Sequence, residues 1–240
     1  MKIAIFADVH SNFLGLQAVL SDIQERGIDT VYCLGDLVGY GPRPNKVIEL
    51  IRKKDISTVM GNYDDAIGNM RLICGCDYKD EQAMKIGEAS ISWTKEQTTE
   101  KNKNWLRQLP QRIEFNVGEL KFLLVHGSPR QLNEYLFENT EEELLNQFLI
   151  ENHCNVLVCG HTHLPYHKQV AKGDVINVGS AGKPKHGNPQ VGYAVLDITT
   201  SGNLKVSFFQ VPYDYEQTAR EIEESGLPVE FAQIIRTGKA

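Results

Sequence analysis

The chain has 240 residues, of which 41% are hydrophobic and 23% charged, so it is long enough to bury one sizeable core. Its formal net charge of −6 excludes a general nucleic-acid coat protein, because such a protein needs a basic face to neutralise phosphates. The apolar run at the N-terminus is interrupted by Asp8 and His10, which makes it too short for a signal peptide, and nothing approaches the length of a bilayer span. With an odd number of cysteines, five, we expect a cytoplasmic protein with reduced thiols and no membrane partner.

The first part of the chain alternates between short apolar runs and helical patterns. Strands are predicted over residues 2–7, 30–34 and 56–60. A first helix is predicted to start at a cap formed by Ser11 or Asn12 and to end at Gly27, and a second helix to span residues 44–53. This alternation predicts right-handed crossovers and a parallel sheet.

The second part of the chain is richer in strands. Helical periodicity over residues 80–109 stops at Pro110, and residues 112–117 and 120–125 read as a hairpin. A helix capped by Thr140 is predicted to reach about Glu151, and further strands are predicted over residues 156–159, 166–170, 174–178, 191–197 and 204–210. Residues 1–240 are expected to form a single domain, whose helical tail at about 214–236 breaks near Gly226 and Pro228.

Five short polar patches follow predicted strands directly. They are Asp8-Val9-His10, Gly35-Asp36, Gly61-Asn62-Tyr63-Asp64, His126-Gly127 and Gly160-His161-Thr162-His163. In an open α/β sheet such patches gather at the carboxyl edge of the strands. In extended backbone, a spacing of two points Asp8 and His10 the same way, and likewise His161 and His163.

These side chains have the chemistry of a metal site. Carboxylate, imidazole and amide-oxygen ligands together suit manganese, iron or zinc better than calcium. Any one patch alone is more often explained without metal, since an Asp after a strand usually caps a helix and a single His usually lies at the surface or in a hydrogen-bonded core. Their joint occurrence, each after its own strand, favours the metal site.

In these motifs the chain resembles the calcineurin-like metallophosphoesterase family, whose pattern is D-x-H, G-D, G-N-H-D/E, a single H and G-H-x-H. The resemblance spans residues 8–163. It implies a four-layer α-β-β-α sandwich, with two mixed sheets flanked by helices, and two divalent metal ions, with manganese favoured over iron and zinc. One metal would be held by Asp8, His10, Asp36 and His163, and the other by Asn62, His126, His161 and the shared Asp36.

One position departs from the family pattern. Tyr63 stands where the family has a His, to which leaving-group protonation is generally assigned, often with help from the following acid, here Asp64. Both are candidate catalytic residues. A phenol is a poorer proton donor at neutral pH than an imidazolium, so Tyr63 favours leaving groups that depart easily, such as those of phosphoanhydrides and nucleotides. The chain resembles a bacterial subgroup with an aromatic residue here, in which diadenosine polyphosphates or other phosphodiesters are hydrolysed.

Two loops carry candidate substrate-binding residues. Tyr40 could stack on a base and Arg43 could pair with a distal phosphate, although a Pro/Gly turn with an exposed aromatic residue explains this loop equally well. Lys183, Lys185 and His186 offer positive charge for an extended phosphate chain, and the alternative is that they are solvated loop charges.

The expected function is hydrolysis of phosphodiester or phosphoanhydride bonds, with dinucleoside polyphosphates as candidate substrates, through a hydroxide that bridges two metals. The expected partner is a small phosphoester or nucleotide, and a homo-oligomer is compatible with the sequence. One alternative is a phosphomonoesterase or protein phosphatase. The other is a catalytically inactive scaffold with the same fold, which Tyr63 favours and the complete set of ligand residues disfavours.

Overall fold

The computed structural model describes residues 1–75, 80–199 and 202–239. One of the five cysteines, Cys76, therefore lies outside the described residues. The elements follow in the order β1 (Lys2–Phe6), α1 (Phe13–Glu25), β2 (Thr30–Cys33), α2 (Pro44–Lys53), β3 (Ser57–Thr58), α3 (Asn62–Gly68), α4 (Glu81–Gln97), α5 (Glu100–Leu106), β4 (Arg112–Val117), β5 (Leu120–Val125), α6 (Glu142–Glu151), β6 (Val156–Cys159), β7 (Tyr166–Val170), β8 (Gly173–Asn177), β9 (Val191–Ile198), β10 (Leu204–Val211), α7 (Tyr215–Ser225) and α8 (Glu230–Thr237).

The strands form two mixed sheets. In the first sheet the order is β10-β9-β1-β2-β3, and in the second it is β4-β5-β6-β8-β7. The pairs β1–β2, β2–β3, β5–β6 and β6–β8 are parallel, while the pairs β1–β9, β9–β10, β4–β5 and β7–β8 are antiparallel. The parallel strands therefore end at the same edge of each sheet, which is the edge where the polar patches occur.

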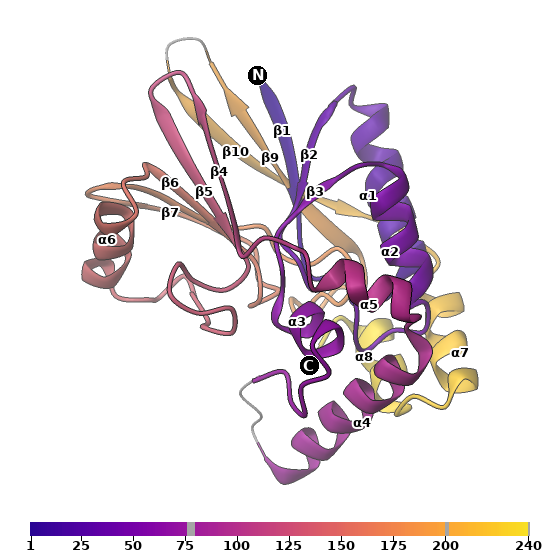
Figure 1. Cartoon of the computed structure of the whole chain (residues 1–240). Helices are drawn as coiled ribbons and strands as arrows, with labels where there is room; N and C mark the ends of the chain where they lie inside the picture. Colours follow the sequence, from indigo (N-terminus) through magenta and orange to yellow (C-terminus); the bar gives the residue numbers. More distant parts are fainter. Residues whose placement is uncertain (76–79, 200–201, 240) are drawn as a thin grey trace.

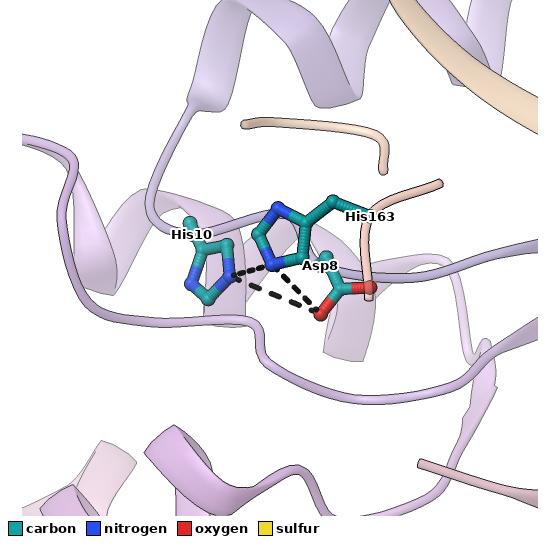
Figure 2. A group of neighbouring side chains, drawn as sticks. All are labelled: Asp8, His10 and His163. Atoms are coloured by element: carbon teal, nitrogen blue, oxygen red, sulfur yellow. Dashed lines mark hydrogen bonds and ion pairs between the residues drawn. The ribbon is translucent and has the colours of Figure 1, made fainter. Parts of the chain in front are cut away.

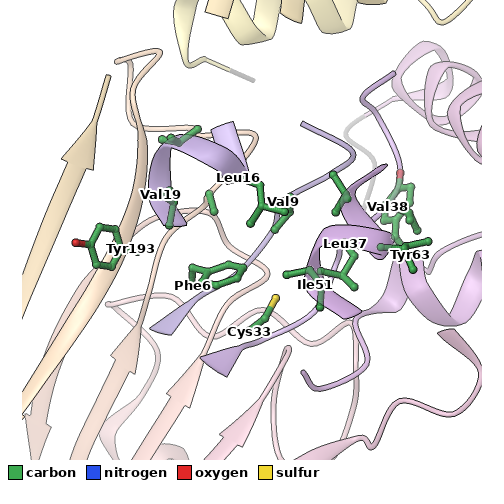
Figure 3. Close-up of a cluster of buried hydrophobic side chains, with 14 of the residues drawn as sticks. Phe6, Val9, Leu16, Val19, Cys33, Leu37, Val38, Ile51, Tyr63 and Tyr193 are labelled. Carbon is green, nitrogen blue, oxygen red and sulfur yellow. The ribbon is translucent and has the colours of Figure 1, made fainter. Parts of the chain in front are cut away.

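The two sheets pack face to face with helices outside them (Figure 1). Along β1, Ile3 and Ile5 belong to the core between the sheets, while Ala4 and Phe6 belong to the core shared with α1 and α2. Figure 3 shows Phe6 in this second core beside Val9 and Cys33. On the far side, Phe148 of α6 packs with buried residues of the second sheet. This alternation gives four layers, and it confirms the predicted α-β-β-α sandwich.

The third predicted strand is shorter than expected. Only Ser57–Thr58 pairs with β2, because the Met60 N–H donates to the carbonyl of Pro110 instead of continuing the sheet. The chain then enters α3 at Asn62, a helix that the sequence did not indicate. This early turn places Asn62 in the first turn of a helix rather than in a loop.

The predicted cap of α6 is wrong. The helix begins after Glu141, and the Thr140 hydroxyl accepts a hydrogen bond from the Phe137 N–H at 2.9 Å. Thr140 therefore closes the turn before the helix, because its Oγ1 lies within reach of a backbone donor three residues earlier.

The C-terminal segment forms two helices that break at Gly226, as predicted. Gly226 has φ 86°, a left-handed conformation that a glycine adopts without strain. Phe231 of α8 lies against Tyr40 with ring centroids 5.0 Å apart, and Arg43 forms an ion pair with Glu221 of α7. The helical pair is thus packed on the loop that follows β2.

Gly182 allows a close approach between two loops at the sheet edge. A Cβ added there would lie 1.7 Å from the carbonyl oxygen of Val9, the residue between Asp8 and His10. We expect Gly182→Ala to lower the free energy of unfolding by about 1–3 kcal/mol, because one loop must move. Urea denaturation measures this loss. Gly192→Ala is a control in which a smaller loss is expected, since its Cβ would lie 3.1 Å from Phe209 O. An equal loss of stability in both variants would contradict the argument.

Candidate metal centre

The seven residues predicted as metal ligands come together at the carboxyl ends of the central strands. Asp8 and His10 follow β1, Asp36 follows β2, Asn62 begins α3, His126 follows β5, and His161 and His163 follow β6. All seven are at most 3% exposed. The site therefore draws on both sheets and is withdrawn from solvent. Their binding of metal stays a prediction.

The first group of candidate ligands consists of Asp8, His10 and His163 (Figure 2). Asp8 Oδ1 lies 3.8 Å from His10 Nε2 and 3.6 Å from His163 Nε2. The two Nε2 atoms are 3.2 Å apart. Three ligand atoms thus face a common point.

The second group consists of Asp36, His126 and His161. His126 Nε2 lies 3.5 Å from Asp36 Oδ2 and 3.2 Å from His161 Nδ1. Asn62 Oδ1 is 3.0 Å from His126 Nε2, and the Asn62 amide is oriented by donation from Nδ2 to the carbonyl of Cys74. An amide oxygen therefore completes this group.

Asp36 faces both groups. Its Oδ2 lies 3.7 Å from His10 Nε2 as well as 3.5 Å from His126 Nε2. Its other oxygen, Oδ1, accepts a hydrogen bond from the Tyr63 N–H at 2.8 Å. One carboxylate oxygen is thus fixed by backbone, and the other is directed between the two groups.

The donor set fits divalent cations. His10 Nδ1, His126 Nδ1, His161 Nε2 and His163 Nδ1 lie against the carbonyls of Val38, Leu34, Asn133 and Lys183, respectively. A ring that donates one N–H to a carbonyl turns the lone pair of its other nitrogen into the site. Asp8 Oδ1 is buried and accepts no hydrogen bond from the described residues. Such converging lone pairs repel one another unless a cation lies between them.

Burial and charge set the protonation of the four histidines. Burial lowers the pKa of His10, His161 and His163, so these rings are neutral at neutral pH. Burial acts in the same sense on His126, but the attraction of the Asp36 carboxylate outweighs it and raises the pKa of His126 to about 9. Three rings are therefore ready to bind metal, while the fourth must lose a proton.

The pKa values of the two acidic candidate ligands are shifted in opposite directions. Burial raises the pKa of Asp8. Burial pushes the pKa of Asp36 in the same direction, but the positive charge of His126 and a hydrogen bond from it lower the pKa overall. Asp36 is accordingly ionised at neutral pH, whereas Asp8 can still hold a proton that a cation would displace.

The backbone at the site is left-handed where extended backbone was expected. Asp8 and His10 have φ values of 54° and 48°, and His161 and His163 have 66° and 63°. The expectation that each pair points one way from an extended strand is therefore wrong. Asp8 and His10 do join one group, but His161 and His163 enter different groups. Conformations of this kind are held by surrounding structure and cluster at functional sites.

The two candidate catalytic residues are both buried. Tyr63 is 1% exposed, and its ring lies edge-on to His10 with centroids 5.5 Å apart. Asp64 accepts hydrogen bonds from the N–H groups of Leu37 and Gly61 at 2.9 and 3.0 Å. Asp64 thus holds the loops around Asp36 in place, and the catalytic roles of both residues stay predictions.

The candidate substrate-binding residues after β2 are engaged by other side chains. Tyr40 packs between Tyr63 and Phe231, with ring centroids 4.6 and 5.0 Å away. Arg43 pairs with Glu221. Stacking of Tyr40 on a base would therefore compete with its contacts to these two rings, and binding of a phosphate by Arg43 would compete with Glu221.

In the loop after β8, the three residues that were candidates for binding a phosphate chain lie in different surroundings. Lys183 is 6% exposed, and its Nζ lies 4.4 Å from the centre of the Tyr40 ring. His186 lines a different pocket, together with Pro165 and Phe208. Lys185, in contrast, lies close enough to the site to act on His163, whose pKa is lowered mainly by burial and additionally by this positive charge.

Asn133 is a residue of the site that the motifs did not indicate. Its carbonyl lies 3.1 Å from His161 Nε2, and its side-chain Nδ2 donates to the carbonyl of Gly75 at 2.6 Å. Gly75 is the neighbour of Cys74, whose carbonyl orients Asn62. Asn133 thereby connects His161 and Asn62, two candidate ligands of the second group, through backbone carbonyls. A sequence motif of side chains gives no indication of such contacts.

Comparison with known proteins agrees with this geometry. The model of the calcineurin-like phosphoesterase superfamily domain matches residues 1–201. An uncharacterised protein of Methanocaldococcus jannaschii is 32% identical over 94% of this chain and 93% of its own length. Phosphodiesterase YfcE of Escherichia coli is 27% identical over 82% of this chain and 88% of its own. The crystal structure of a metallophosphoesterase from Sphaerobacter thermophilus has 29% identity and a TM-score of 0.77, covering 99% of both chains.

The chain therefore belongs to the calcineurin-like phosphoesterase superfamily, and it is a metal-dependent phosphoesterase. The family predicted from the motifs is confirmed. None of the helices in the described part of the chain has the length and apolar character that crossing a bilayer requires.

Metal binding should release protons. At about pH 7 we expect roughly one to two protons per protein to leave, from His126 and in part from Asp8, because both have raised pKa values and must be deprotonated to act as ligands. Metal affinity should therefore increase from about pH 6 to about pH 9. Calorimetric titration in buffers of different ionisation enthalpy counts the protons. Binding without proton release would contradict this protonation scheme.

Removing the Asn133 side chain should weaken the second group selectively. In Asn133→Ala the tether to Gly75 is lost, and we expect one metal equivalent to bind about 10–100-fold more weakly, as for other residues that orient ligands. Metal analysis after dialysis measures the equivalents retained. Asn146→Ala on α6, which removes a comparable bond to the Lys172 N–H, is the control. Two equally tight metals in Asn133→Ala would exclude this role.

Proposed function

We propose that this protein hydrolyses phosphodiester or phosphoanhydride bonds with two divalent cations, one in each group of ligands. The observation that carries the proposal is the position of Asp36 Oδ2, 3.7 Å from His10 Nε2 and 3.5 Å from His126 Nε2. A single carboxylate oxygen facing nitrogen donors of both groups is suited to bridging two cations. Mixed nitrogen and oxygen donors suit manganese, iron or zinc, and we favour manganese.

Bound cations would supply a water nucleophile of lowered pKa and positive charge for the phosphoryl oxygens. The protein's own part is to position the cations and to exclude bulk water. The neutral rings of His10, His161 and His163 offer lone pairs without competing protons, and the backbone carbonyls hold their orientation. Asn62 adds an oxygen without adding charge. The burial of all seven side chains keeps the local dielectric low, which strengthens electrostatic stabilisation of the transition state.

The preference for diesters and anhydrides rests on Tyr63. The Tyr63 ring lies edge-on to the His10 ring, with centroids 5.5 Å apart, and Tyr63 holds the position at which the family pattern has a histidine. A phenol protonates a leaving oxygen poorly at neutral pH, so substrates with good leaving groups are favoured. The relative YfcE is a phosphodiesterase, which supports the same class. Nucleotides, including dinucleoside polyphosphates, are the candidate substrates.

Two further properties are part of the proposal. We regard residues 1–240 as one domain, since the ion pair of Arg43 with Glu221 and the contact of Tyr40 with Phe231 bind the C-terminal helices to the sheet-edge loops. A cytoplasmic location is supported by the described cysteines, Cys33, Cys74, Cys154 and Cys159, which form no disulfide with one another.

The proposal is tested by Asp36→Asn together with a substrate panel. We expect the manganese-loaded protein to hydrolyse bis-p-nitrophenyl phosphate and diadenosine tetraphosphate in preference to p-nitrophenyl phosphate. Asp36→Asn should reduce kcat by about a hundredfold or more and lower the number of bound metals, because the bridging charge is lost. Metal analysis and initial rates, repeated with iron and zinc, give the result.

Asp174→Asn is the matched control, since Asp174 Oδ1 is hydrogen-bonded to a histidine ring, His167 Nε2, outside the site. Preference for the monoester would contradict the argument from Tyr63. A protein that binds two metals yet hydrolyses none of the panel would favour an inactive scaffold with this fold.

A further inference from the structure

A stack of aromatic rings leads from the candidate metal centre to the surface. The Tyr135 ring lies against His161 with centroids 4.0 Å apart and an interplanar angle of 28°. Phe137 continues the stack, 5.6 Å from Tyr135 and only 5° from parallel. Phe137 is 42% exposed, so the outer end of the stack reaches the surface.

Phe137 forms one wall of a pocket of about 440 Å³. Other walls are provided by Glu138, Asn139, Thr162, Leu164 and Pro165. Thr162 lies between His161 and His163, so the pocket begins at the backbone that carries one ligand of each group. Its volume lies in the range of small-molecule sites, and its lining combines an apolar floor with a few polar groups, as such sites do.

The loop that carries the two aromatic rings is fixed before any ligand binds. Leu136, between them, is 1% exposed, and its carbonyl accepts a hydrogen bond from the Tyr166 hydroxyl at 2.9 Å. Lys168 Nζ donates to the carbonyls of Glu138 and Thr140, both at 3.0 Å. Tyr166 and Lys168 belong to β7, so a strand of the second sheet holds the loop. Binding of a ligand would therefore cost little conformational entropy in this loop.

We propose that this pocket binds the planar ring of the substrate, a nucleobase, while the phosphoryl group lies at the metal centre. The proposal rests on the proposed function and names its substrate class as nucleoside phosphodiesters or anhydrides. A base stacks on the exposed face of Phe137, because any base offers a π-face to an aromatic side chain. Glu138 and Asn139 supply an acceptor and an amide for the polar edge of the base, and Leu164 covers its apolar side.

This site takes the role that the sequence suggested for Tyr40. The Tyr40 ring is enclosed by Tyr63, Phe231 and Lys183 and faces the C-terminal helices. The space beside Tyr40 amounts to about 10 Å³, whereas Phe137, on the second sheet's side of the site, lines the pocket of about 440 Å³. The base is therefore expected on the side of β7 and not on the side of α8.

The experiment compares two esters with the same leaving group: the p-nitrophenyl ester of thymidine monophosphate and methyl p-nitrophenyl phosphate. Only the first carries a base. In the manganese-loaded protein the ratio of kcat/KM for the two esters should favour the nucleoside. Phe137→Leu keeps apolar volume but removes the ring, and it should reduce this ratio about tenfold through KM, as expected from the loss of one base–aromatic stack. Phe137→Tyr keeps the ring and should keep the ratio.

Calorimetric binding of thymidine monophosphate and of methyl phosphate to the same proteins gives a second readout. Weaker binding of the nucleotide alone in Phe137→Leu supports the base site, even if neither ester is hydrolysed, an outcome that would count against the proposed function only. A ratio and a nucleotide affinity that stay the same in Phe137→Leu would overturn the base site and leave the proposed function standing. Equal treatment of both esters by the unchanged protein would overturn it as well.

Discussion

The structure depends on a buried carboxylate placed between two sets of nitrogen donors. Asp36 is 1% exposed, with Oδ1 fixed by the Tyr63 N–H and Oδ2 directed at His10 and His126. Burying such a charge is unfavourable unless it is compensated. The positive charge of His126 provides part of the compensation, and divalent cations would provide the rest. The site is therefore arranged around charge that the protein by itself balances only in part.

The sheets and loops act as a rigid frame for this charge. The backbone carbonyls of Leu34, Val38, Asn133 and Lys183 each face a ring nitrogen of one histidine. The left-handed backbone at Asp8, His10 and Asp36 persists because each of these loops is held between a buried parallel strand at one end and a helix packed on the same sheet at the other. The geometry of the candidate ligands is thus decided in part by packing at some distance from them.

The surroundings of the centre are asymmetric. On one side, α7 and α8 pack on the loop of Tyr40 and Arg43, where Arg43 is held by Glu221. On the other side, the loop that follows His126 presents Tyr135 and Phe137 beside a pocket. The larger of the pockets on these two sides therefore lies toward β7 and not toward the C-terminal helices. The same asymmetry explains why charges near the site differ in effect, with Lys185 acting on the histidines and Arg43 neutralised by its partner.

The sequence by itself determined the strands, the family and the seven residues that converge. Apolar runs that end in Asp or His mark strand ends, and parallel strands end at one edge, so the location of the site followed from local pattern. The resemblance had already assigned His161 and His163 to different metals. Only the tertiary structure decided that the backbone at these residues is left-handed, that Asp64 binds backbone, and that Tyr40 and Arg43 contact the C-terminal helices. It also brought in Asn133 and Phe137. The physical reason is that these outcomes depend on left-handed backbone and on contacts between segments far apart in the chain, and neither leaves a periodic signal in the residues involved.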